Sequence, residues 1–221
     1  FIFIILPFGK IIKVSFLELN IDYITWISIP FLYFTSSIFA MIISSESTNE
    51  YIYTDFLIES VKTSKIKFVY LLLGIIAFAF LCGMVEFLVS YVILYSLVEL
   101  PYVLLNFVYY ILLLIIYLFL FSNIGVFIGF IKIKYLRFLI YISIFFLKIF
   151  YSNIFIPYNK SIELAEIENL KYTVINFYEN IRVLMFSDYN FQYSPILFLI
   201  FIGICMLIIN HQIIIYLYQK K

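Results

Sequence analysis

Two ionisable side chains stand inside otherwise apolar stretches, and they are the first candidates for chemistry. Glu86 interrupts a run that extends to residue 98, and Lys148 interrupts the run 138–157. A charge within a membrane span costs about 2.5–3.5 kcal/mol on insertion scales, so it needs a partner or a function. Three roles stay open: an ion pair between the two that ties their helices together, a part in transport or proton relay, and local accommodation. In the last case Glu86 lies near an interface or faces another subunit, and Lys148 extends its amine to the membrane surface.

Residue patterns for catalysis, metal binding or nucleotide binding are sparse. The single histidine, His211, cannot supply paired imidazole ligands, and no HExxH, CxxC or GxxxxGK[ST] pattern occurs. Cys82 and Cys205 lie far apart within apolar runs, which is typical of small buried hydrophobic residues. We therefore expect no catalytic residue, no cofactor and no metal site, and expect that any ATP used is bound by another polypeptide.

One group of carboxylates keeps an enzymatic alternative open. Glu163, Glu166 and Glu168 lie close together in the sequence. A membrane-embedded acyl or glycosyl transferase needs clustered acidic residues or histidines near one interface, and this group is the one place that offers them. A solvated helix face explains the same three residues equally well.

The composition excludes a soluble domain and favours a membrane protein. Of the 221 residues, 66% are hydrophobic and 12% are charged, whereas soluble domains average about 45–50% and about 25%. A chain of this length cannot hide so much apolar surface in its own core, so lipid must cover the rest. The net charge of +1 gives no concentrated basic face, which argues against nucleic acid as a partner.

Apolar stretches predict the spans of a single all-α transmembrane domain over 1–221. A helix needs roughly 20 apolar residues to cross about 30 Å of hydrocarbon, and the runs do not alternate as strands of a lipid-facing barrel would. The six expected spans are a partial one at 1–9 and complete ones at 23–45, 68–98, 102–131, 138–157 and 194–219. The chain starts at Phe1, and we expect the first span to be the end of a longer one.

Three polar segments separate these spans. Segment 46–67 has apolar residues near helical spacing and predicts a short amphipathic helix on the membrane surface. Segment 132–137 is a basic turn, and segment 158–190 mixes acidic and apolar residues as an interfacial helix does.

The distribution of lysine and arginine suggests an orientation. Placing 46–67, 132–137 and the C-terminus on one side collects eight basic residues there and leaves five on the other side. The eight are Lys62, Lys65, Lys67, Lys132, Lys134, Arg137, Lys220 and Lys221. Because positive residues stay in the cytoplasm, we expect a cytoplasmic C-terminus and an extracellular segment 158–190.

The order of these elements resembles a type-2 exporter permease of the ATP-binding cassette (ABC) class over nearly the whole chain. In that family the segment after the second span is a coupling helix that often carries Gly-Thr and then Ser-x-Pro-x-Ser. Here Thr54, Ser60 and Ser64 stand in the matching positions, with Tyr53 in place of the glycine and Lys62 in place of the proline.

A second likeness follows the fifth span. The family commonly has a proline at the outer boundary and, after an interfacial helix, an acidic residue three positions before an arginine. Pro157, Glu179 and Arg182 stand in those places, without the Asn-Pro that usually precedes the acidic residue.

The resemblance implies a permease subunit that exports a substrate by alternating access. It would dock on cytosolic ATP-binding cassette subunits through 46–67, pair with a second permease copy or homologue, and sit in membrane lipid, with the bacterial plasma membrane as its expected place. The alternative is a structural or proton-translocating subunit of a respiratory-type complex in the mitochondrial inner membrane. The content of 27 Phe and 21 Tyr and the missing initiator methionine favour that alternative.

Overall fold

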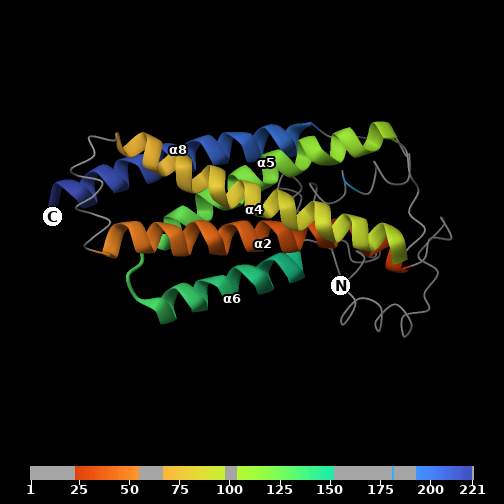
Figure 1. Ribbon diagram of the computed structural model, residues 1–221, viewed down its shortest axis with the longest axis horizontal. Coiled ribbons are helices and arrows are strands. Elements are labelled where there is room, and N and C mark those ends of the chain that lie inside the picture. The colour runs from red at the N-terminus through yellow and green to blue at the C-terminus, as the bar shows by residue number, and fades with distance from the viewer. Residues whose placement is uncertain (1–22, 55–66, 98–103, 152–180, 182–192, 221) are drawn as a thin grey trace, which may run out of the picture.

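A computed structural model describes residues 23–54, 67–97, 104–151, 181 and 193–220 of the chain. Within these ranges the chain is helical and contains no strand, as the sequence predicts. The helices are α2 (Tyr23–Tyr53), α4 (Phe68–Leu97), α5 (Leu104–Gly129), α6 (Lys134–Tyr151) and α8 (Ser194–Lys220), and they run side by side along the long axis of the molecule (Figure 1). Each helix pairs its own backbone N–H and C=O groups, which the interior of a lipid bilayer requires.

Four helices of the described part are long and apolar enough to cross a membrane, namely α2, α4, α5 and α8. The shortest of them, α5, has 26 residues and is about 39 Å long at about 1.5 Å per residue, which exceeds the roughly 30 Å of hydrocarbon. The chain is therefore an integral membrane protein. These helices coincide with the expected spans 23–45, 68–98, 102–131 and 194–219.

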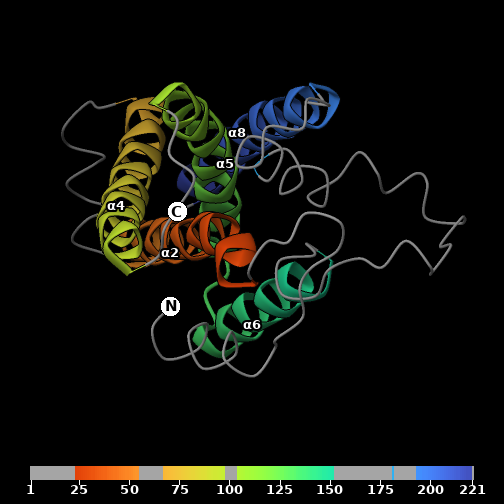
Figure 2. The same ribbon diagram turned by 90° about the vertical axis from the view of Figure 1, so that its right-hand side faces the viewer.

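The bundle is centred on α2 and α5. These two helices make the most extensive contact, α4 packs against both, and α8 packs mainly against α5 (Figure 2). The outer faces of α4 and α8 carry exposed apolar side chains such as Tyr70, Val92 and Phe201. An apolar surface of this kind suits contact with lipid tails, whereas α2 is buried along most of its length.

Two glycines let α2 and α5 approach closely. A Cβ atom on Gly125 would lie 2.0 Å from Ser44 Oγ and 2.2 Å from the Met41 carbonyl oxygen. A Cβ atom on Gly129 would lie 2.6 Å from the Ser45 carbonyl oxygen. The spacing Gly-x-x-x-Gly places both on one face of α5, the pattern by which membrane helices pack backbone to backbone. Contact at this seam depends on the absence of side chains at both positions.

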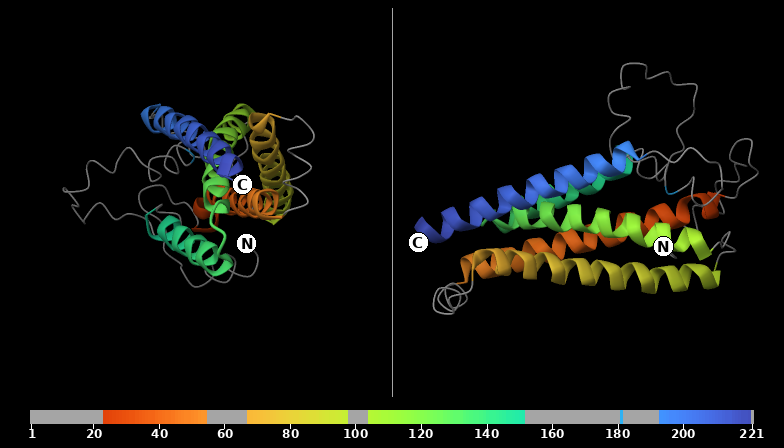
Figure 3. Two further views of the ribbon diagram at one scale, coloured as in Figure 1. Left: turned by 90° about the vertical axis from the view of Figure 1, so that its left-hand side faces the viewer. Right: turned by 90° about the horizontal axis from the view of Figure 1, so that it is seen from above.

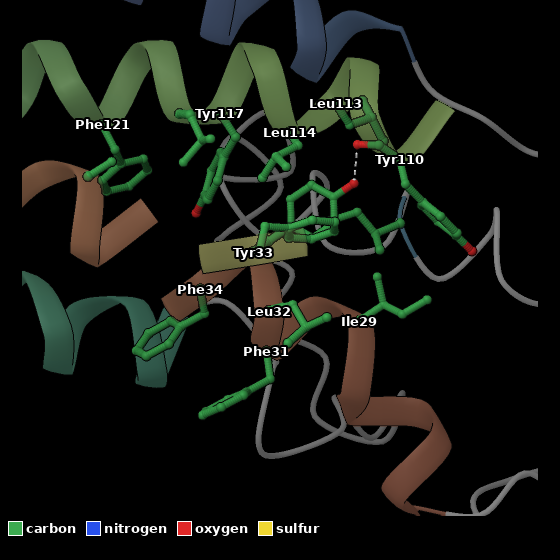
Figure 4. Packing of buried hydrophobic residues seen from close by; sticks show 14 of the residues in the cluster. Ile29, Phe31, Leu32, Tyr33, Phe34, Tyr110, Leu113, Leu114, Tyr117 and Phe121 are labelled. Carbon is green, nitrogen blue, oxygen red and sulfur yellow. Dashed lines mark hydrogen bonds between the residues drawn. The ribbon is translucent and has the colours of Figure 1, made fainter. Parts of the chain in front are cut away.

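Aromatic side chains fill the core between α2, α4 and α5 away from that seam. Tyr33 of α2 packs edge-on against Phe87 of α4, with ring centroids 5.1 Å apart, and lies 6.4 Å from the ring of Tyr117 on α5. The Tyr33 hydroxyl donates to the Tyr110 carbonyl oxygen on α5, as the dashed line in Figure 4 marks. Burial of Tyr33 is thus coupled to a hydrogen bond between the two central helices.

The fifth expected span, 138–157, differs from the structure. α6 begins at Lys134 and ends at Tyr151, and it is not among the helices apolar enough to be spans. It lies beyond α2, on the side away from α8 (Figures 1 and 2). Its 18 residues include three basic side chains, Lys134, Arg137 and Lys148, which is more charge than the other four helices carry in their apolar stretches. The fifth span and the partial first span, which lies outside the described residues, stay predictions.

The interfacial segment expected to begin at residue 46 is also placed differently. Residues 46–53 continue α2 without a break, and the helix ends at Tyr53. At 31 residues α2 is about 46 Å long, so its polar end projects beyond the hydrocarbon. The prediction of a separate amphipathic helix is therefore wrong for residues 46–53, and residues 55–66 lie outside the described part of the chain.

The described parts of the segments expected on the cytoplasmic side lie at one end of the bundle. The C-terminal ends of α2, α5 and α8 and the first turns of α4 and α6 lie at this end (Figure 3). Lys67, Lys132 and Lys134 are exposed there. The helices of the described part therefore alternate in direction from one to the next.

Candidate functional site

Lys148 lies in a cage of aromatic rings between α2, α5 and α6. Its ammonium nitrogen is 3.9 Å from the ring centroid of Phe121, 5.0 Å from that of Phe34 and 5.0 Å from that of Tyr117. It also donates a hydrogen bond to the Ser37 hydroxyl. Only 6% of the Lys148 residue is exposed. The side chain therefore points into the bundle, and the alternative that it extends to the membrane surface is wrong.

The cage is built by residues at helical spacing on two central helices. Phe34 and Ser37 are three positions apart on α2, and Tyr117 and Phe121 are four positions apart on α5, so each pair shares a face. Figure 4 shows Phe34, Tyr117 and Phe121 on facing sides of the gap between these helices. The Tyr117 and Phe121 rings lie 4.7 Å apart. The α2–α5 pair alone thus forms the aromatic walls, and α6 contributes the cation.

The interactions around Lys148 are strong enough to keep a cation buried in the bundle. A cation over an aromatic ring gains about 0.5–1 kcal/mol at exposed sites and about 2 kcal/mol or more when desolvated. Three rings and one hydroxyl can together offset the roughly 2.5–3.5 kcal/mol that a lysine costs within a membrane helix. Lys148 is accordingly held by π-faces and a hydroxyl from α2 and α5.

Glu86 occupies a different place in the bundle. Its Oε1 atom accepts a hydrogen bond from Ser90 one turn later on α4, at 3.2 Å, and Thr35 of α2 faces the same carboxyl group. Its Oε2 atom is buried and has no hydrogen-bond partner within the described part of the chain. α4 and α6 do not contact each other there, since α2 lies between them. The ion pair between Glu86 and Lys148, one of the three roles left open by the sequence, is therefore not formed.

A second polar cluster joins the end of α5 to α2. The Asn49 side-chain amide donates to the carbonyl oxygens of Gly129 at 3.1 Å and Ile131 at 3.2 Å. The Tyr53 hydroxyl donates to the Phe130 carbonyl oxygen at 2.6 Å. The last carbonyls of a helix have no partner within it, so donors from a neighbour complete its end. Two side chains from the final turns of α2 thus hold the C-terminus of α5.

The same cluster binds the start of α6. Arg137 donates to the Glu46 carboxylate at 2.9 Å and to the Ile131 carbonyl oxygen at 2.9 Å. The Tyr141 hydroxyl, one turn later, donates to Glu46 Oε1 at 3.0 Å and accepts from the Ser45 hydroxyl at 2.6 Å. Arg137, Tyr141 and Lys148 lie on one face of α6, toward α2, while apolar side chains such as Phe138 and Leu147 are exposed. The helix therefore has its polar face inward, the reverse of a helix on a soluble protein.

The residues suggested by the family resemblance lie mostly beyond the described chain. Thr54 is exposed and follows directly after the last residue of α2. Ser60, Ser64, Glu179 and Arg182 lie outside the described residues. Of the expected coupling residues, the described part of the chain therefore includes Thr54 and the helix that leads to it.

Several residues that organise the site were not identified from sequence. Gly125 and Gly129 had a usable signal, because Gly-x-x-x-Gly in an apolar run is a known mark of helix packing. No comparable sequence signal marks Arg137 or Glu46, since both lie in polar segments where a charge is ordinary. Their pairing depends on the path of the chain between residues 91 positions apart.

Metal and cysteine chemistry find no support in the described ranges. No group of three or more His, Cys, Asp or Glu side chains there is placed to hold a metal ion. Cys82 and Cys205 are both free thiols and lie on α4 and α8. The described residues can hold a cation among aromatic rings. They can also keep the neighbouring ends of α2, α5 and α6 together as a rigid unit through hydrogen bonds.

Comparisons with known proteins add no family. No protein-family model, no curated protein and no solved structure matches the chain.

Proposed function

We propose that this chain is the transmembrane permease subunit of an ABC-type exporter, which moves its substrate by alternating access while separate subunits hydrolyse ATP. The observation that carries the proposal is the projecting end of α2. This helix is the most buried in the bundle, and it continues past the apolar region to Tyr53, directly before the segment in which a coupling helix is expected.

The contacts at that end suit the transmission of a push. A force applied beyond Thr54 meets α2 as a continuous helix of 31 residues rather than a flexible loop. Asn49 and Tyr53 transmit a movement of α2 to the end of α5 through their hydrogen bonds, and Glu46 transmits it to α6 through Arg137. Rigid elements joined in this way move as bodies, which is how domain closure in one subunit becomes rotation of helices in another.

The distribution of charge agrees with a cytoplasmic position for the same end. Lys67, Lys132 and Lys134 are exposed there, and Arg137 lies in the first turn of α6. Positive residues near the ends of spans favour the cytoplasmic side, where ATP-binding subunits would dock. The proposal therefore places Thr54 in the cytoplasm and Tyr193, at the start of α8, on the opposite side.

The test is site-specific photo-crosslinking in the native membrane. A photoreactive amino acid replaces Thr54, and a matched variant carries it at Tyr193, which is 70% exposed at the other end of the bundle. After irradiation, the chain is purified in mild detergent and its adducts are identified by mass spectrometry. We expect an adduct with a soluble subunit that contains a Walker-A motif, from position 54 and not from position 193.

Two results contradict the permease assignment. One is the retention of respiratory subunits in place of an ATPase, which would support the structural or proton-translocating alternative. The other is an ATPase adduct that forms equally from both positions, because a soluble subunit cannot reach both sides of a membrane. Loss of the adduct when residues 55–66 are scrambled, with the bundle still folded, would locate the docking segment.

A further inference from the structure

We propose that the rings of Phe34, Tyr117 and Phe121 form a binding site for lipophilic organic ammonium ions, and that Lys148 is its built-in occupant, displaced when such an ion binds. The ring centroids lie 3.9–5.0 Å from the Lys148 nitrogen, and Ser37 provides a hydroxyl. Aromatic cages of this kind are the usual receptors for quaternary ammonium groups.

The walls of the cage belong to two helices other than the one that fills it. Phe34 lies on α2, while Tyr117 and Phe121 lie on α5, and these two helices have the most extensive contact in the described bundle. One turn beyond Phe121, Gly125 fixes their separation, because its position lies against the Met41 backbone. The positions of Tyr117 and Phe121 are therefore set by α5 and its contact with α2. The Phe34 ring also packs against Phe145 of α6, with ring centroids 5.2 Å apart, so a movement of α6 opens that side of the cage.

The occupant comes from the helix with the least extensive contacts. α6 touches only α2 and α5 within the described residues, and over few positions. Its N-terminal part is tied to α2 by Arg137 and Tyr141, whereas Lys148 lies near its other end. The ammonium also sits on a flexible four-carbon stem. Displacement of Lys148 can thus proceed by rotation of its stem or by a swing of α6 about its tied end.

The chemistry of the site selects its ligand. The π-faces of the three rings attract positive charge without requiring N–H donors from the ligand. A quaternary ammonium has no N–H group to leave unpaired. Exposed apolar side chains on α6, including Leu139, Phe146 and Leu147, form a surface that suits lipid. A ligand with an alkyl tail can therefore reach the cage from the bilayer. If the proposed function holds, on which this step rests, such ions are the substrate class of the permease.

The experiment measures binding to the purified chain in lipid nanodiscs, with no ATPase present. The probe is radiolabelled hexyltrimethylammonium, and the control ligand is its neutral carbon isostere, in which carbon replaces nitrogen. Lys148→Met keeps most of the length of the side chain and removes the competing charge, so we expect it to bind the probe at least tenfold more tightly than the wild type. Adding Phe121→Leu should abolish that gain, and Lys134→Met, on an exposed part of α6, should change nothing.

A second measurement uses the unaltered protein and does not depend on the folding of a variant. A lipid-soluble acylating reagent that reacts with amines is added, and the acylation of Lys148 is followed by mass spectrometry. Its rate reports how often the Lys148 amine leaves the cage. We expect the probe to accelerate this acylation severalfold and the neutral isostere to leave it unchanged. Equal acylation with and without the probe, or equal binding of the probe and its isostere, would overturn the proposal. Either result is independent of whether an ATPase crosslinks to position 54, so the two proposals fail separately.

Discussion

The Arg137 guanidinium on α6 lies 2.9 Å from the Glu46 carboxylate on α2, and the two side chains differ sharply in exposure. The Arg137 side chain is 4% exposed, whereas that of Glu46 is 43% exposed. Arg137 also donates to the Ile131 carbonyl oxygen, so a single side chain joins α2, the turn after α5 and the first turn of α6. This relationship explains how α6 is attached to a bundle that it contacts only sparsely.

The first prediction concerns that ion pair. Glu46→Ala leaves a buried guanidinium short of its acceptor, and Arg137→Met leaves the Ile131 carbonyl without this donor. We expect each change to lower the free energy of unfolding by about 1–3 kcal/mol, since hydrogen bonds to charged groups contribute about 1.5–3 kcal/mol. The double variant should be less destabilised than the sum of the two, by about 1 kcal/mol or more, in a double-mutant cycle measured by unfolding in mixed micelles.

The control for this cycle is Lys134→Met. Lys134 is exposed in the same turn of α6, and its replacement should change the free energy of unfolding by no more than about 0.5 kcal/mol. Strict additivity of the Glu46 and Arg137 effects would show that the pair contributes no coupling in the membrane protein.

The second prediction concerns the contact between α2 and α5. Gly125→Ala places a methyl group 2.2 Å from the Met41 carbonyl oxygen, and a backbone atom cannot move aside as a flexible side chain can. The helices must separate, and we expect a loss of at least about 1–3 kcal/mol, the usual cost of overpacking a core. Thermal unfolding in detergent, followed by size-exclusion chromatography, measures the loss.

Gly74 on α4 is the matched control for that substitution. A Cβ atom there meets nothing within 4 Å. Alanine has the higher helix propensity, so Gly74→Ala should leave the protein unchanged or stabilise it by up to about 1 kcal/mol. Equal effects of the two substitutions would mean that Gly125→Ala causes no clash and that the contact between α2 and α5 does not depend on this glycine.

Hydropathy is enough to find helices that lipid surrounds, and it fails where a helix turns its polar side inward. The runs at 68–98 and 194–219 became α4 and α8 with little change in their bounds, because most of their side chains are apolar in every direction. α6 begins four residues before its expected start, since Lys134 and Arg137 belong to its first turn. Inward-facing charge lowers the hydropathy of a helix that the bundle nevertheless holds.

The partners of the buried charges were beyond prediction from sequence. Lys148 meets Ser37, which is 111 positions away, and Phe121. One charge in each of two expected spans suggests an ion pair, but α2 lies between α4 and α6 and separates Glu86 from Lys148. The end of α2 was predicted too early because residues 46–53 are polar. Asn49 and Tyr53 keep this stretch helical through hydrogen bonds to α5 that a local pattern does not reveal.

The third prediction concerns the polar contact between α8 and α5. The Asn210 amide donates to the Asn123 carbonyl oxygen at 2.8 Å, while its own side-chain oxygen is buried without a partner in the described ranges. Interhelical hydrogen bonds in membrane proteins average about 0.6 kcal/mol, so Asn210→Leu should change the free energy of unfolding by no more than about 1 kcal/mol. Unfolding in mixed micelles measures this, and a loss well above 2 kcal/mol would point to a further ligand of the amide.

The fourth prediction concerns the orientation of the bundle. Thr54 and Tyr193 are exposed at opposite ends of the described helices, and the basic residues gather at the end that carries Thr54. A membrane-impermeant maleimide should therefore label Thr54→Cys only from the cytoplasmic side and Tyr193→Cys only from the opposite side. Each variant is made in a background with Cys82 and Cys205 replaced by Ala, so that the introduced thiol is the one measured. Labelling of both positions from the same side would show that the helices between them do not cross the membrane as an alternating bundle. Labelling with the two sides reversed would place the C-terminus outside. The proposed permease would then lack the cytoplasmic docking end that it requires.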